Sequence, residues 1–217
     1  MIGRARVAAY EILCAVSAGN ADLPAAIAVA RGGLHDERDR ALAAEIASGV
    51  QRWRAALDHV IVAFSKRPIS KLDSEIVEIL RLSVYQLLHL TRVPASAIVD
   101  DAVNLVRRAG KTSATGFVNA VLREISRKRA VVPLPPRPVE ASDRDAVLDY
   151  FSITLSHPRW LAARWLDRVG FDAFAIWRLS GRVRGRRATS MDGKPRAAPD
   201  RRRARLRSVT AARCAPA

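Results

Sequence analysis

Residues 73–90, DSEIVEILRLSVYQLLHL, predict a long helix with an unusually wide apolar face. On a helical wheel of about 100° per residue, the apolar side chains fill about half of the circumference. Apart from Leu82, the opposite arc is polar and carries Glu75, Glu78, Arg81, Gln86 and His89. Because one neighbour cannot cover so wide a face, we expect a central helix between at least two others. Tyr85 borders both arcs, so its ring should be buried and its hydroxyl hydrogen-bonded.

Amphipathic helices are also predicted before and after this segment. Residues 3–18, 22–30 and 36–64 carry apolar side chains at helical spacings of three and four. Pro94 should open a helix that Gly110 ends, and a further helix should reach about residue 129. The sequence therefore predicts an all-α bundle of about six or seven helices over residues 4–129.

The character of the chain changes after this bundle. Several prolines within residues 130–141 forbid a helix and predict an extended linker at a domain boundary. Residues 142–179 predict a short helical extension, in which Ser142 and Asp145 resemble a capping box. Apolar periodicity is lost from residue 180 to 217, so this stretch is predicted to be a disordered basic tail.

The formal net charge of +16 is unevenly distributed. Residues 1–179 hold 25 Lys and Arg against 19 Asp and Glu, whereas residues 180–217 hold 12 against 2. A field of this sign attracts polyanions, and nucleic acid is the commonest such partner. GC-rich coding is the alternative explanation, because Arg greatly outnumbers Lys.

Several cations are candidates for binding nucleic-acid phosphates. Arg4 and Arg6 lie in the first turn of the first helix, where cations oppose the helix dipole at a cost of up to about 1 kcal/mol. No acidic residue precedes them, so either an external phosphate compensates the charge or both side chains are simply solvated. The remaining candidates lie at a helix end or along one helix face, where a solvated surface is the alternative: Arg107, Arg108, Lys111, Arg123 and Arg127.

Other kinds of chemistry find little support in the sequence. Asp100 and Asp101 point about 100° apart on a helix, so they cannot share a substrate. Cys14 and Cys214 exclude a disulfide framework, and the scattered histidines lack metal-ligand spacing. We therefore predict no catalytic residue, metal or cofactor. Since neither a signal peptide nor a membrane-spanning run is visible, we expect a cytoplasmic protein without membrane contact.

Several separate segments resemble known helical domains. Two segments resemble the NusB-type domain, namely YQLLHLTRVPASAIVDDAVNLVRRAG at residues 85–110 and GFVNAVLREI at 116–125. Three further segments resemble the N-terminal domain of the RsmB family, also called Sun or Fmu, more closely than they resemble NusB itself: residues 5–13, 37–58 and 69–82. Residues 155–171, LSHPRWLAARWLDRVGF, are similar to the segment that leads RsmB proteins into their catalytic part. The resemblance implies a NusB-like fold and RNA binding at the arginine-bearing start of the first helix.

The RsmB family methylates cytosine C5 in small-subunit ribosomal RNA, using parts that this sequence lacks. Its Rossmann-like S-adenosylmethionine domain carries a glycine-rich loop and two cysteines, one after Pro and one after Thr. Here Cys14 follows Leu13, and Cys214 follows Arg213. Only 38 residues follow residue 179, whereas a doubly wound domain needs more than about 100. We therefore expect no methyl transfer by this chain alone.

The resemblance implies an RNA-binding NusB-type module, the rRNA-recognition part of a truncated RsmB-like 16S rRNA methyltransferase. Residues 142–179 would then be the remnant of its connection to the catalytic domain. One alternative is a stand-alone NusB-like factor in transcription antitermination. Another is a helical protein-interaction domain that binds a ribosomal protein or associates with itself. The tail has two explanations, namely out-of-frame translation after about residue 179 or a genuine basic segment that strengthens RNA binding.

Overall fold

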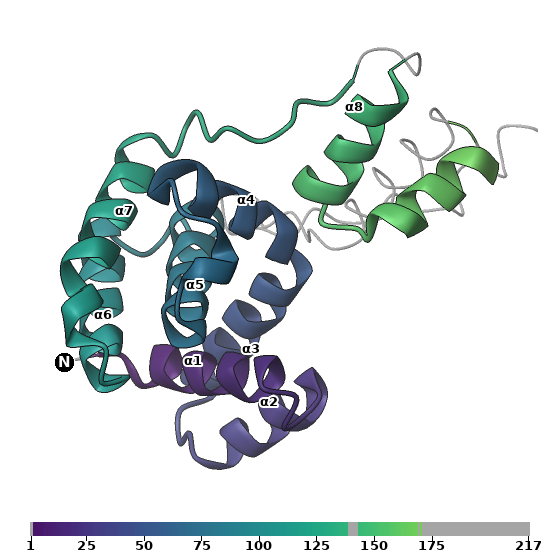
Figure 1. Cartoon of the computed structure of the whole chain (residues 1–217). Helices are drawn as coiled ribbons and strands as arrows, with labels where there is room; N and C mark the ends of the chain where they lie inside the picture. Colours follow the sequence, from purple (N-terminus) through teal and green to yellow (C-terminus); the bar gives the residue numbers. More distant parts are fainter. Residues whose placement is uncertain (1, 139–142, 169, 171–217) are drawn as a thin grey trace, which may run out of the picture. The chain divides into compact units, whose positions relative to one another are not determined.

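The computed structural model describes residues 2–138, 143–168 and 170, and this part of the chain contains helices and no strand (Figure 1). The all-α prediction is confirmed. The α-helices are α1 (Arg4–Ser17), α2 (Leu23–Gly32), α3 (Glu37–Arg52), α4 (Arg54–Ser65), α5 (Ser74–His89), α6 (Ala95–Arg108), α7 (Thr115–Arg127) and α8 (Arg144–Asp149). Two 3-10 turns, η1 (Ile69–Lys71) and η2 (Thr112–Ala114), and a π-helix, η3 (Tyr150–Thr154), complete the numbered elements. The predicted basic tail lies outside the described residues.

Helix α5 is the centre of the bundle. It contacts α1, α3, α4, α6 and α7, and Figure 1 shows it enclosed among them. The prediction of a central helix is therefore confirmed. Tyr85 also lies as predicted, because its ring is buried and its hydroxyl donates a 2.8 Å hydrogen bond to Glu45 Oε1.

Most of the polar arc of α5 is buried, which the sequence did not predict. Glu78, Arg81 and Gln86 are all buried, each with less than 5 % of its surface exposed. Leu82 is buried as well. The helical wheel considers one helix at a time, whereas the surrounding helices cover α5 on every side and supply polar partners to its buried polar groups. His89 at the end of this arc is exposed, and the side chain of Glu75 at its start is 39 % exposed.

The long helix predicted over residues 36–64 is two helices. They meet at Trp53, which ends α3 and begins α4 with φ −110° and ψ 20°. The apolar spacing continues across this residue, so periodicity alone could not locate the break. The break lets the two halves cover different neighbours, since α3 packs on α1 and α2 while α4 packs on α7.

Acidic side chains begin three of the helices. Asp22 accepts a hydrogen bond from the backbone N–H of Ala25 at the start of α2, as the sequence predicts. Asp36 caps α3 in the same way. Asp143 caps α8, whereas the Ser142 predicted for this role lies outside the described residues. Pro94 precedes α6 as its N-cap residue rather than as its first helical residue.

The segment after the linker packs on α4. The linker residues Val132 and Leu134 lie against the bundle core, and η3 contacts α4. A helix over residues 159–168 follows, and Phe151 is almost completely buried. The domain boundary at the linker stays a prediction.

A hydrogen bond from the bundle to Ser156 suggests a test of this packing. The hydroxyl of Ser156 accepts a 3.0 Å hydrogen bond from the backbone N–H of Ala56, in the first turn of α4. Ser156→Ala removes this cap and should lower the free energy of unfolding by about 1 kcal/mol in urea titrations. Ser156→Gly is the matched variant, and it should cost less because glycine adopts the φ of +56° without strain. Unchanged stability of Ser156→Ala would contradict a role for this contact.

Candidate nucleic-acid interface

Five of the seven predicted phosphate-binding cations lie on or just after the packed helices α6 and α7, whereas Arg4 and Arg6 lie on α1. The short connection through η2 makes these helices antiparallel neighbours, so the start of α6 lies beside the end of α7. Arg107, Arg108 and Lys111 therefore lie at one end of the pair. Arg123 and Arg127 lie toward the other end. The structure does not bring the predicted residues together into one site.

Arg6 is held inside the bundle. Its Nη1 forms a 2.9 Å ion pair with Asp101 Oδ2 on α6, and its Nε donates a 2.8 Å hydrogen bond to Gln86 Oε1 on α5. The Arg6 and Asp101 side chains are only 15 % and 13 % exposed. The anion that compensates Arg6 at the start of α1 is therefore an internal carboxylate. Arg4, two residues earlier, is exposed.

The cations at the end of α6 make exposed contacts. Arg108 pairs with Glu11 at 3.1 Å, and Lys111 pairs with Asp73 at 3.1 Å. The hydrogen bond to Asp73 raises the pKa of Lys111, so this side chain is a cation at neutral pH. Exposed ion pairs of this kind contribute little to stability, and a phosphate can therefore compete with them.

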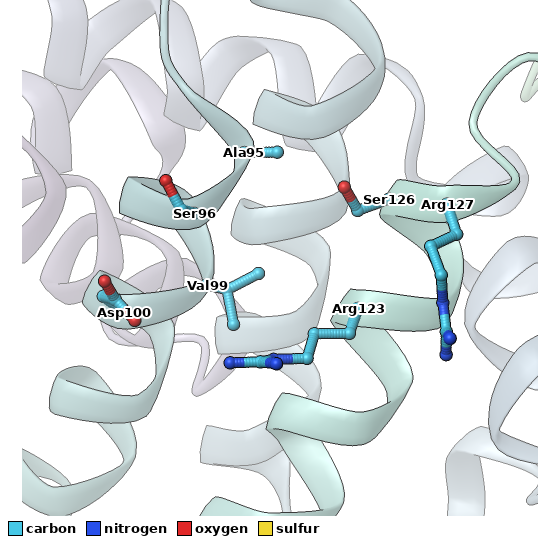
Figure 2. Close-up of a pocket in the computed structure, with 7 residues that line it drawn as sticks. All are labelled: Ala95, Ser96, Val99, Asp100, Arg123, Ser126 and Arg127. Carbon is cyan, nitrogen blue, oxygen red and sulfur yellow. The ribbon is translucent and has the colours of Figure 1, made fainter.

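A basic groove runs between the start of α6 and the end of α7. One hollow of about 520 Å³ is lined by Ala95, Ser96, Val99, Asp100, Arg123, Ser126 and Arg127 (Figure 2). A second hollow of about 570 Å³ is lined by Thr91, Arg92, Val93, Pro94, Ala95, Ser126, Arg127 and Arg129. The two hollows share Ala95, Ser126 and Arg127, so we describe them together as the α6/α7 groove. Figure 2 shows Arg123 reaching from α7 toward Val99 on α6.

Two arginines of this groove were not among the predicted site residues. Arg92 lies in the turn before α6, and Arg129 lies just after α7. Neither arginine stands out in the sequence, because a single arginine near a helix end does not by itself indicate a binding site. The signal that could have found them is the short connection between α6 and α7, because antiparallel neighbours bring the start of one helix to the end of the next.

Metal binding and thiol chemistry find little support among the described residues. No three His, Cys, Asp or Glu side chains among them are grouped so that they could hold a metal ion. Burial raises the pKa of the Cys14 thiol, which disfavours the reactive thiolate. None of the described helices is both long and apolar enough to cross a bilayer.

The fold and the groove define a class of protein, a helical-bundle domain with a basic surface. The model of the NusB family matches residues 3–127, more than half of the chain, so the protein belongs to the NusB family. This confirms the resemblance that the sequence segments showed.

Individual relatives fall into two groups. The chain is 32 % identical over 156 residues to "Ribosomal RNA small subunit methyltransferase B" of Pseudomonas putida, covering 72 % of this chain and 33 % of the relative. It is 32 % identical over 140 residues to the "Probable ribosomal RNA small subunit methyltransferase B" of Bacillus subtilis, covering 63 % and 29 %. It is 31 % identical over 93 residues to "Transcription antitermination protein NusB" of Marinobacter nauticus, covering 43 % and 59 %. The chain thus spans about a third of the length of these methyltransferases.

Proposed function

We propose that this chain is an RNA-binding NusB-type module, and that it is the rRNA-recognition part of an RsmB-like 16S rRNA cytosine-C5 methyltransferase. The observation that carries the proposal is the length of the similarity. The match to the Pseudomonas relative covers 156 residues, more than the 3–127 span of the family match. The similarity therefore includes residues that follow the bundle. In the described structure, the residues after the linker pack on α4 through η3.

A stand-alone NusB-like factor in transcription antitermination is the second candidate. It is favoured by the Marinobacter relative, of which this chain covers 59 %. That similarity covers only 43 % of this chain, so it accounts for less of it than the methyltransferase match does. A protein-interaction role, with a ribosomal protein or a second copy as partner, would use the same helical surfaces.

We assign different parts of the chain to different tasks under this proposal. Residues 4–129 bind RNA, and residues 130–141 and 142–179 connect this module to a methyltransferase domain. Methyl transfer itself is the task of that other domain and needs S-adenosylmethionine. The protein works in the cytoplasm, where ribosomal RNA is made. The exposed Arg4, Arg107 and Arg108 and the partly exposed Lys111 are proposed as phosphate contacts, whereas Arg6 remains paired with Asp101.

RNA binding with a strong salt dependence is the expected result. The full chain should bind 16S rRNA fragments in fluorescence anisotropy, with a slope of log K against log salt of about −3 or steeper, since each neutralised phosphate of a single strand contributes about −0.7. A chain ending at residue 171 should still bind, because residues 1–171 form one compact unit. Binding that disappears with the tail would contradict RNA recognition by the bundle and would favour a protein-interaction domain.

A further inference from the structure

We propose that the α6/α7 groove holds the sugar–phosphate backbone of the bound RNA. This inference rests on the proposed RNA-binding function and names the surface that performs it. The groove differs from the start of α1, where Arg6 is already neutralised by Asp101.

The groove gathers arginines from separate segments. Arg92 comes from the turn before α6, Arg123 and Arg127 from α7, and Arg129 from the residues after α7. All four are exposed, and Asp100 is the only acidic residue among those that line the two hollows. Arg123 and Arg127 are one turn apart, about 6 Å along the helix axis. The lining therefore carries an excess of positive charge that follows the groove.

The existing contacts of these arginines leave them available to a phosphate. Arg127 pairs with Glu124 at 2.6 Å, but 73 % of its side chain is exposed. Glu124 also pairs with Lys128 at 2.8 Å, and that hydrogen bond lowers the pKa of Glu124. Glu124 therefore keeps a cationic partner when Arg127 turns to a phosphate. Arg123 Nε donates a 3.0 Å hydrogen bond to Asn119, a neutral acceptor that leaves its charge uncompensated.

The start of α6 adds a favourable field to the same groove. Ala95 and Ser96, its first residues, line the groove, and the first turn contains no acidic residue. Pro94 before them provides no side-chain cap. The positive end of the helix dipole therefore faces the groove and favours an anion there.

The other residues that line the groove predict an affinity for RNA that does not depend on its base sequence. Val99 and Ala95 are apolar, and Ser96, Ser126 and Thr91 offer hydroxyl groups that can donate to phosphate oxygens. Contacts of this kind position a nucleic acid but do not read base edges. The groove should therefore bind RNAs of different sequence with similar strength.

The test compares two full-length triple variants that lose the same charge. One is Arg92→Gln/Arg127→Gln/Arg129→Gln in the groove. The control is Arg31→Gln/Arg38→Gln/Lys71→Gln, whose residues are exposed and do not line the groove. Anisotropy is measured with two labelled single-stranded RNAs of unrelated sequence over a series of KCl concentrations. The groove variant should bind both RNAs about tenfold more weakly, with a salt slope shallower by about 2, and the control should change affinity less than about twofold.

The possible outcomes separate this inference from the proposed function. Wild-type protein that binds neither these RNAs nor 16S rRNA fragments at low salt overturns the proposed function, whereas binding to 16S fragments alone overturns the groove as a sequence-independent site. If the wild-type protein binds RNA and the groove variant and the control lose the same amount of affinity, the groove is overturned as the RNA site while the proposed function stands. The same result is expected if the groove binds an acidic protein segment instead of RNA. Arg92→Lys/Arg127→Lys/Arg129→Lys keeps the charges and should retain most of the affinity. Circular dichroism checks that all variants are folded.

Discussion

Replacing Arg81 by methionine should lower the free energy of unfolding by about 3–5 kcal/mol, because the substitution removes the closest cation from the buried Glu78 carboxylate. Arg54 Nη2, 3.9 Å from Glu78 Oε1, is a more distant and more exposed partner. The Arg81 side chain is only 5 % exposed and Glu78 only 3 %. Arg81 Nε and Nη2 donate to the two oxygens of Asp58 at 2.6 and 2.8 Å, and Nη1 donates to Glu78 Oε1 at 2.5 Å. The single substitution removes all three hydrogen bonds.

This cluster also joins separate helices. Arg81 and Glu78 are on α5, Asp58 is on α4, and Ser17 at the end of α1 donates a 2.7 Å hydrogen bond to Glu78 Oε1. Burial alone would lower the pKa of Arg81, but the hydrogen bonds and charges of Asp58 and Glu78 raise it. The guanidinium is therefore charged at neutral pH, and its bonds to Asp58 hold α5 to α4.

Urea unfolding followed by circular dichroism measures this effect. The matched control is Arg81→Met/Glu78→Leu, which removes the buried carboxylate together with the cation. It should recover a large part of the lost stability, because the remaining Asp58 side chain is 26 % exposed and can be solvated. A loss below about 1 kcal/mol for Arg81→Met alone would show that the cluster contributes little to folding.

Substituting Gly49 by alanine should destabilise the protein by about 3 kcal/mol, although alanine is the better helix former. Gly49 is buried in α3, and the ring of Tyr85 on α5 lies directly against its backbone. A Cβ at position 49 would lie deep inside van der Waals contact with several atoms of this ring. The ring would have to move, and its hydroxyl would lose the hydrogen bond to Glu45.

Gly116 provides the matched control for this prediction. It is also helical, in α7, but it is exposed and an added Cβ would meet no atom within 4 Å. Gly116→Ala should therefore raise the free energy of unfolding by about 0.5–1 kcal/mol. Thermal and urea unfolding of both variants would give shifts of opposite sign. A stabilising Gly49→Ala substitution would contradict the close packing of α3 on α5.

Local spacing was sufficient for much of the fold. The apolar arc of residues 73–90 predicted a central helix, and the position of Tyr85 on its border predicted a buried ring with a bonded hydroxyl. Both follow from the geometry of one helix, in which every residue turns by a constant angle. The same geometry could not show that the polar arc is buried too, because burial there depends on helices that approach from elsewhere.

Single-helix patterns were less informative about the candidate site. Arg6 and Asp101 are 95 positions apart, so no local spacing reveals that they form an ion pair. Arg123 and Arg127 were recognisable from their four-residue step, whereas Arg92 and Arg129 join them only where the two helix ends meet. Trp53 similarly lies within an unbroken apolar pattern although one helix ends and another begins there.

The sequence alone determines that this protein is helical, which faces of its helices are apolar and that its net charge is positive. These properties depend only on the residue types and on their spacing along the chain. Tertiary packing determines which charges remain available to a ligand. Residues distant in the chain neutralise Arg6 and Arg81, while the meeting of α6 and α7 leaves a row of arginines exposed. The physical reason is that ion pairing and burial depend on distance in space, which a linear pattern does not contain.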